Sequence, residues 1–269
     1  MATSSFSRLR GLAPALRAGI LIAACAAAAL VVLSLPELPE WPGPRGLADR
    51  RTFLGIPNAF DVLSNLPFAL AGILGLARAR ALERELRPAG LVLFASLLAV
   101  AFGSSFFHLD PSQSRLLVDR LPITVAFLSL FALVLGDRIS PGLARTALAP
   151  LLAFGLGTAL LWYLGGETPG RGDLRPYALV QAVPMVALPL LLVFYPGRLD
   201  ERRLFVAFAL YGTAKGCEAL DHQLFALLGV ASGHTLKHLA AGAACFFLAP
   251  ERRARPPFVR QSQDPRCPT

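Results

Sequence analysis

The sequence predicts an all-α protein: a polytopic membrane helical bundle with a seven-helix core and one extra helix at the N-terminus. Hydrophobic residues form 55% of the 269 residues, and the mean hydropathy is +0.56. Only 16% of the residues are charged, whereas about a quarter are charged in a typical soluble domain. Several charge-free runs also approach the roughly 20 residues that a helix needs to cross the hydrocarbon core: 18–36, 88–107, 146–166 and 176–197.

The first apolar run, 18–35, follows the basic segment RLRGLAPALR, which is also how a signal peptide begins. Its length and the bulky VVLSLPELPE after it favour a retained transmembrane helix. The Pro-rich PELPEWPGPRG then leads to a second helix that begins near Asn58. We expect three parts: 1–57 with a cytoplasmic N-terminus, the extra helix and a linker; 58–250 as the seven-helix domain; and 251–269 as a polar, basic, disordered tail.

Turn signals separate the remaining apolar segments: DPSQS, SPG, GETPGRGD, YPGR and ASG. The predicted spans between these turns are 88–108, 116–136, 143–165, 176–196, 203–229 and 233–250. Together with the first run and the helix near Asn58, they make eight.

The net charge of +9 is explained by membrane topology, so we expect no nucleic-acid partner. If the N-terminus is cytoplasmic and the spans alternate, most of the 26 basic residues fall on the cytoplasmic side. This is the positive-inside bias that sets topology. The Arg-rich, Lys-poor usage is typical of a high-GC bacterium, and we therefore expect the bacterial inner membrane.

Polar residues gather at the outer end of the predicted spans. The third span ends in GSSFFHLD, which places Ser104 and His108 four residues apart, and the fourth begins with LLVDR, which carries Asp119. The last span begins with GHTLKHLAAG, so His234 and His238 share one helix face. An ionisable group inside a span costs about 2.5–3.5 kcal/mol and indicates function. Alternating topology brings these residues to one depth, toward the periplasm.

Three neutral imidazoles and an open position are the ligand set of a catalytic zinc site. We therefore expect His108, His234 and His238 to bind Zn²⁺, which activates water and polarises a carbonyl oxygen. Asp119 would accept the proton of the water, and Ser104 would donate a hydrogen bond to the developing oxyanion.

These residues also have ordinary structural interpretations. A histidine at a helix end can be an interfacial cap, and a membrane serine often bonds a carbonyl of its own helix. Asp119 can pair with Arg115 or Arg120. Two other predicted spans carry polar residues as well: Asp61, Ser64 and Asn65 in the second, and Lys215, Glu218, Asp221 and His222 in the seventh. We expect Lys215, buried mid-span, to pair with Glu218 or Asp221, and His222 to be no ligand.

The ordered motifs resemble those of the alkaline ceramidases, within a superfamily of seven-helix membrane hydrolases that includes the adiponectin-receptor-like proteins. GSSFFH matches the Ser-x-x-x-His of that family, and Asp119 follows His108 at the family's spacing. HTLKH matches the His-x-x-x-His of the last helix. DVLSNLPF resembles the Asn-Thr-x-Ser-Asn run of the first core helix, and EALDH a Trp-x-x-Asp-Arg/Lys segment. The likeness covers roughly 55–250.

The resemblance implies the same zinc ligands, with Asp119 acting on the water, Ser104 near the carbonyl, and Ser64, Asn65 and Asp221 in support. It implies a membrane-lipid substrate: ceramide or a related N-acyl lipid, hydrolysed to a sphingoid base or amine and a fatty acid. Asn58 stands where the family has a calcium-binding glutamate, so we expect no calcium.

Two other interpretations stay open. One is a zinc-binding receptor or signalling protein of the same superfamily that does not hydrolyse its ligand. The other is a proton-coupled transporter that uses Lys215, Glu218 and Asp221 as a relay. Against the transporter, the sequence has no duplicated halves.

Overall fold

The described part of the chain is built of α-helices. The computed structural model describes residues 6–36, 46–166 and 172–251, and these ranges contain no β-strand. The predicted all-α class and helical-bundle architecture are therefore confirmed. Most of the Pro-rich linker and, beyond Glu251, the predicted basic tail lie outside the described residues.

Six helical segments are long and apolar enough to cross a membrane, which makes the chain a multi-pass membrane protein. They are 14–34, 59–81, 87–109, 113–138, 141–164 and 175–194. The helices themselves are α1 (Ser7–Arg10), α2 (Pro14–Ser34), α3 (Ala59–Leu63), α4 (Leu66–Arg78), the 3₁₀ helix η2 (Ala79–Ala81), α5 (Arg87–Leu109), α6 (Gln113–Arg138), α7 (Pro141–Thr146), α8 (Leu148–Leu164), α9 (Arg175–Phe194), α10 (Glu201–Ala219), α11 (Asp221–Leu228) and α12 (Gly233–Leu248).

Helices also form where the last two spans were predicted, but they differ from the expected single crossings. The seventh is interrupted at Leu220, where α10 ends and α11 begins, and α12 has only 16 residues. Neither belongs to the six segments above. The seven-helix core and the total of eight spans therefore stay predictions.

Local sequence signals explain most helix starts. Proline occupies the first turn of α2, α4, α5, α7 and α9, where its missing N–H removes no hydrogen bond. The side chains of Ser112, Asp200 and Ser232 accept backbone N–H groups at the starts of α6, α10 and α12. Ser112 and Ser232, which lie in turns noted in the sequence, thus act as caps and, with Asp200, fix where α6, α12 and α10 begin.

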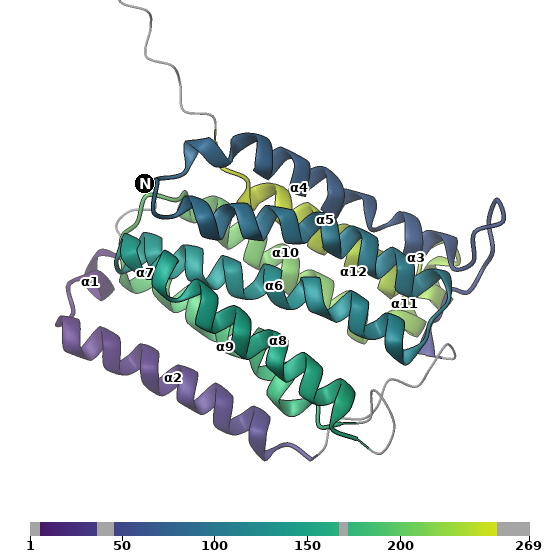
Figure 1. The fold of residues 1–269 in the computed structure, drawn as a ribbon, viewed down its shortest axis with the longest axis horizontal. Coiled ribbons are helices and arrows are strands. Elements are labelled where there is room, and N and C mark those ends of the chain that lie inside the picture. The colour runs from purple at the N-terminus through teal and green to yellow at the C-terminus, as the bar shows by residue number, and fades with distance from the viewer. Residues whose placement is uncertain (1–5, 37–45, 167–171, 252–269) are drawn as a thin grey trace, which may run out of the picture.

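The long helices lie side by side, with α2 at one edge beside α9 (Figure 1). Arg10 donates hydrogen bonds to the carbonyl oxygens of Leu192 and Val193, and Arg17 donates one to that of Phe194. Arginines at a helix C-terminus satisfy carbonyls that have no partner within the helix. The Arg10 contacts hold α1, and the Arg17 contact holds α2, at the position predicted for the extra helix, against the end of α9.

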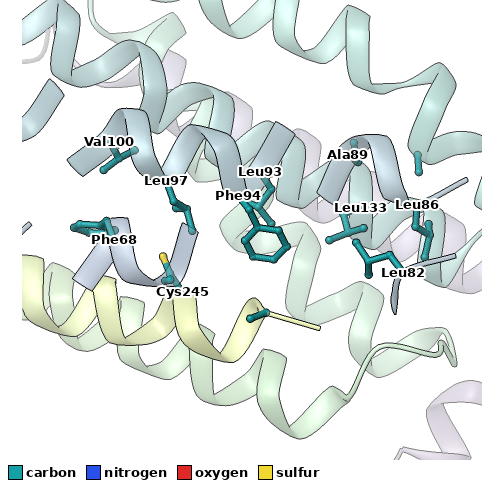
Figure 2. Packing of buried hydrophobic residues seen from close by; sticks show 14 residues of the cluster. Phe68, Leu82, Leu86, Ala89, Leu93, Phe94, Leu97, Val100, Leu133 and Cys245 are labelled. Atoms are coloured by element: carbon teal, nitrogen blue, oxygen red, sulfur yellow. The ribbon is translucent and has the colours of Figure 1, made fainter. Parts of the chain in front are cut away.

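A core of apolar side chains joins α4, α5, α6 and α12. Figure 2 shows Phe94 and Leu97 of α5 among Phe68 of α4, Leu133 of α6 and Cys245 of α12. Small residues in the same cluster, among them Ala71, Ala89 and Ala132, let the helices approach closely, as is typical of membrane bundles. This packing sets the relative positions of the helices that carry the histidines.

Candidate metal centre

The three histidines lie together at one end of the bundle. His108 is in the last turn of α5, and His234 and His238 are in the first two turns of α12. The Nε2 atoms of His108 and His234 are 3.2 Å apart, and one ring nitrogen from each of the three residues lies within 4.8 Å of the others. His108 and His238 are buried, and His234 is half-buried. The group can hold a metal ion.

The second nitrogens of two rings meet the partners that metal-bound histidines usually have. His238 Nδ1 lies 2.9 Å from the Ser64 hydroxyl and 3.2 Å from the carbonyl oxygen of Asp61. His108 Nδ1 lies 3.8 Å from Asp61 Oδ2, and both of these buried atoms lack a hydrogen bond among the described residues. Ligating histidines direct their other nitrogen at a carboxylate or carbonyl, so the arrangement fits a metal site. Imidazole donors suit several transition metals, zinc among them.

Asp61 is a residue of the site for which the sequence suggested no role. Its side chain is 1% exposed, and Oδ1 accepts hydrogen bonds from the Thr235 hydroxyl at 2.6 Å and the Ser232 hydroxyl at 3.3 Å. Asp61 therefore ties the start of α12 to α3 while Oδ2 faces His108. The sequence signal that could have indicated this role is a carboxylate inside a predicted span, three residues before Ser64.

Asp221 contributes by holding the backbone of α12. Its Oδ1 accepts the backbone N–H of His234 at 2.7 Å, and its Oδ2 accepts that of Ala48 at 3.1 Å. A Cβ at Gly233 would overlap the Cys217 carbonyl oxygen and would lie 2.6 Å from Asp221 Cα. Only glycine at position 233 lets α12 approach Cys217 and Asp221 this closely. This close approach and the helix break at Leu220 together place Asp221 under the histidine pair. The supporting position expected for Asp221 agrees with this geometry.

Ser104 and Asp119 lie side by side because α5 and α6 touch at Gly103. A Cβ at Gly103 would lie 2.6 Å from the Val118 carbonyl oxygen. Ser104 and Asp119 both line the cavity described below, and the buried Oδ1 of Asp119 has no hydrogen-bond partner among the described residues.

The two arginines suggested as ion-pair partners for Asp119 make their closest contacts with other groups. Arg115 forms an ion pair with Asp110 at 3.2 Å. The Arg120 guanidinium lies over the Trp162 ring, 4.0 Å from its centroid. Within the described ranges, neither arginine forms an ion pair with Asp119, which leaves this carboxylate facing the cavity described below.

Asn58 and Asn65 fix α3 around the site. The Asn58 amide donates to the His108 carbonyl oxygen at 2.7 Å, from a left-handed backbone conformation (φ 45°) that asparagine tolerates. The Asn65 amide donates to the carbonyl oxygen of Asp61 at 2.9 Å, and its own buried Oδ1 has no hydrogen-bond partner among the described residues. Asn65 thus presents an unused acceptor.

The prediction that Lys215 is buried was wrong. Its side chain is 51% exposed, and it pairs with Glu218, one of its two expected partners. The other carboxylate oxygen of Glu218 binds Lys237 at 3.0 Å. Asp221, the other expected partner, instead bonds backbone N–H groups because it begins α11 on the far side of the break. His222 is exposed and lies outside the histidine group.

A cavity of about 220 Å³ runs from the site into the bundle. One end is polar and includes Ser104, Asp119 and His238, with Asn65 beside them. The other polar lining residues are Gln181, Tyr211, Lys215, Glu218 and Lys237. Most of the remaining wall is apolar and is formed by residues such as Leu97, Ile123, Leu130, Val134, Met185, Leu192, Leu204 and Leu248. The stretch of α6 from Asp119 to Val134 is roughly 22 Å long at the rise of an α-helix. The polar end of the cavity therefore matches a lipid headgroup, and its apolar part matches an acyl chain.

The segment before α3 closes over the same end of the bundle, where Figure 1 also shows α3 and α11. Arg51 donates hydrogen bonds to both carboxylate oxygens of Asp49 and to the carbonyl oxygens of Gly229 and Val230. Burial alone would raise the pKa of Asp49, but the hydrogen bonds and charge of Arg51 outweigh it and hold that pKa below its usual value. The hydrogen bonds from Arg51 to Gly229 and Val230 join the segment to the loop before α12.

Comparisons with protein-family models, curated proteins and solved structures find no match to this chain. The resemblance to the alkaline ceramidases therefore rests on the sequence motifs alone.

Proposed function

We propose that the chain is a zinc-dependent membrane hydrolase that cleaves the amide bond of ceramide or a related N-acyl lipid. The products are a fatty acid and a sphingoid base or amine. One observation carries the proposal: His238 of the three-histidine group lines the polar end of a mostly apolar cavity together with Ser104 and Asp119. An acyl chain fits the apolar part, and its amide would then lie beside the histidines.

Each polar residue has a task in this reaction. His108, His234 and His238 would hold the zinc ion, which supplies a Lewis acid for the amide carbonyl and activates water. Asp119 takes a proton from the attacking water and passes it to the leaving amine nitrogen, as a general base and then a general acid. Ser104 donates a hydrogen bond to the carbonyl oxygen as negative charge develops there. Asn65 Oδ1 accepts a hydrogen bond from the substrate's N–H or hydroxyl.

Residues around the site keep it in shape. Ser64 orients the His238 ring, Asp61 Oδ2 faces His108 Nδ1, and Asp221 fixes the backbone at His234. Fixed ligands need little reorganisation during the reaction. We further propose that the protein resides in a bacterial inner membrane, because of its Arg-rich, Lys-poor usage. The distribution of its basic residues favours an orientation with this end toward the periplasm.

The two other functions are less well supported. A proton relay of Lys215, Glu218 and Asp221 lacks its third member, since Asp221 is bonded to the backbone N–H groups of Ala48 and His234. A receptor of the same architecture would bind the lipid and the metal without turnover, and no observed contact favours it.

The test measures metal content and fatty-acid release together. Wild-type chain purified in detergent should carry about one zinc per chain by elemental analysis and release fatty acid from ceramide or N-oleoylethanolamine. The double variant His234→Ala/His238→Ala should lose both properties, because two of the three ligands are gone. His222→Ala, at the exposed fourth histidine, is the matched control and should keep both. Folded wild-type protein that takes up no zinc would refute the proposal, and zinc without hydrolysis of any N-acyl lipid would favour the receptor.

A further inference from the structure

Lysine is almost absent from this chain, and the two lysines present meet at one carboxylate. The sequence has 26 basic residues, of which only Lys215 and Lys237 are lysines. They come from different helices, α10 and α12, yet Glu218 binds Lys237 through Oε1 and Lys215 through Oε2. All the other basic residues are arginines, among them Arg10 and Arg17, which bind carbonyl oxygens at the end of α9.

This lysine pair, Lys215 and Lys237, lies on the wall of the cavity at its polar end. Both residues and Glu218 line the cavity, as do Ser104, Asp119 and His238. Lys237 directly precedes His238 in the chain. A ligand that enters the cavity therefore meets the lysine pair beside the metal centre.

The cavity also opens near Lys215, because that side chain lines it and is nevertheless half exposed. The adjacent wall comes from α9 and α10, which are bridged by a hydrogen bond from the Tyr211 hydroxyl to Gln181 Oε1 at 3.1 Å. Tyr211 and Gln181 both line the cavity. A lipid that entered between α9 and α10 would pass Lys215 before it reached the histidines.

The lysine pair has donors to spare. Each ammonium group has three N–H donors, and in the described part of the chain each has one acceptor, an oxygen of Glu218. The two ammonium groups therefore share Glu218 as their ion-pair partner among the described residues.

We propose that Lys215 and Lys237 bind an anionic group, a carboxylate or a phosphate, at the head of an acyl lipid. Glu218 holds the two ammonium groups in position when no such ligand is bound. The apolar wall of the cavity takes the acyl chain. The choice of an acyl lipid rests on the proposed function. The inference narrows the ligand to an anionic lipid: either a substrate with a negative charge near the scissile amide, or the released fatty acid with its carboxylate.

The test uses ligands that have no amide bond, so that binding is measured without turnover. Oleate and oleyl phosphate carry an anion on the same chain as neutral oleyl alcohol. Their dissociation constants are measured by calorimetry on the full chain in detergent, with its metal bound. The wild type should bind at least one of the two anions about tenfold more tightly than the alcohol, as expected for a charge-assisted hydrogen bond. Preference for oleate indicates the product carboxylate, and preference for oleyl phosphate indicates a phosphate headgroup.

Some variants are expected to weaken anion binding and one to strengthen it, and this contrast separates anion recognition from a structural role of the lysines. Lys215→Met and Lys237→Met should each weaken anion binding about tenfold and leave oleyl alcohol within about twofold. Glu218→Gln should tighten anion binding, because it removes the competing carboxylate. Arg202→Met, at an exposed cation in the first turn of α10, is the control and should change neither.

Equal affinity of the wild type for all three ligands would overturn the inference, as would equal weakening of all three in the lysine variants. If those variants fail to fold, Glu218→Gln and the salt dependence of wild-type binding decide. Anion binding should then fall with ionic strength while alcohol binding stays constant. Because none of these ligands is hydrolysed, loss of anion preference is distinguishable from loss of hydrolase activity.

Discussion

At the scale of single residues, the site depends on groups that orient the histidines as much as on the histidines themselves. The spacing of His234 and His238 on one helix face was readable from the sequence, and so was the convergence with His108 at one end of the bundle. The role of Asp61 was not, because it depends on which way a short helix, α3, turns its carboxylate. No periodicity in DVLSN encodes that direction.

Replacing Asp61 with asparagine should weaken metal binding about 10–100-fold, the usual effect of losing a carboxylate behind a ligating histidine. The amide oxygen of the introduced side chain can still accept the hydrogen bond from Thr235, so α12 should stay in place while the charge that faces His108 Nδ1 is lost. The measurement is competition between the purified protein and a chelator of known affinity. Asp110→Asn, at an exposed carboxylate paired with Arg115, serves as the control. Equal metal affinity in both variants would contradict the role assigned to Asp61.

At the scale of elements, the breaks within helices matter more to the site than the helices do. The apolar runs predicted the positions of the helices well, because burial in lipid requires a long apolar stretch. They did not predict the breaks at Ser64–Asn65 and at Leu220, since hydropathy does not register a change of backbone direction. Both breaks place polar groups, Ser64 at His238 and Asp221 at His234, under the metal centre.

Substituting Gly233 with alanine tests the contact between α12 and the second break. The added Cβ would overlap the Cys217 carbonyl oxygen and Asp221 Cα, so α12 must shift, at a cost of about 1–3 kcal/mol. We expect a lower Tm and reduced zinc content in the purified protein. Gly212→Ala on α10 is the matched control: no atom lies within 4 Å of the added Cβ, so the better helix propensity of alanine should leave Tm unchanged or higher. A Gly233→Ala variant with wild-type Tm and zinc content would show that α12 does not need this close approach.

At the scale of the whole molecule, the two ends of the bundle are held together by different chemistry. Away from the histidines, at the last turn of α6, the buried Arg138 forms ion pairs with Asp137 at 2.9 Å and Glu201 at 2.8 Å. Glu201 also binds Arg10, so this network joins the start of the chain to α6 and α10. At the opposite end, Glu218 pairs with Lys215 on its own helix and with Lys237 on α12. There, α3, α5 and α12 meet around the histidines and Asp61.

Metal should therefore contribute to the stability of the whole chain, because the three ligands link α5 to α12. A ligand that binds only the folded state, at roughly a thousand times its Kd, stabilises it by about 4 kcal/mol. We expect a chelator to lower the Tm of the wild type by several degrees, and zinc added back to restore it. The chelator should leave the Tm of His234→Ala/His238→Ala unchanged, since that variant has no metal to lose. An equal shift in both proteins would mean that the chelator acts elsewhere, and no shift in a zinc-loaded wild type would mean that the helices are held at this end by Asp61, Thr235 and Asp221 alone.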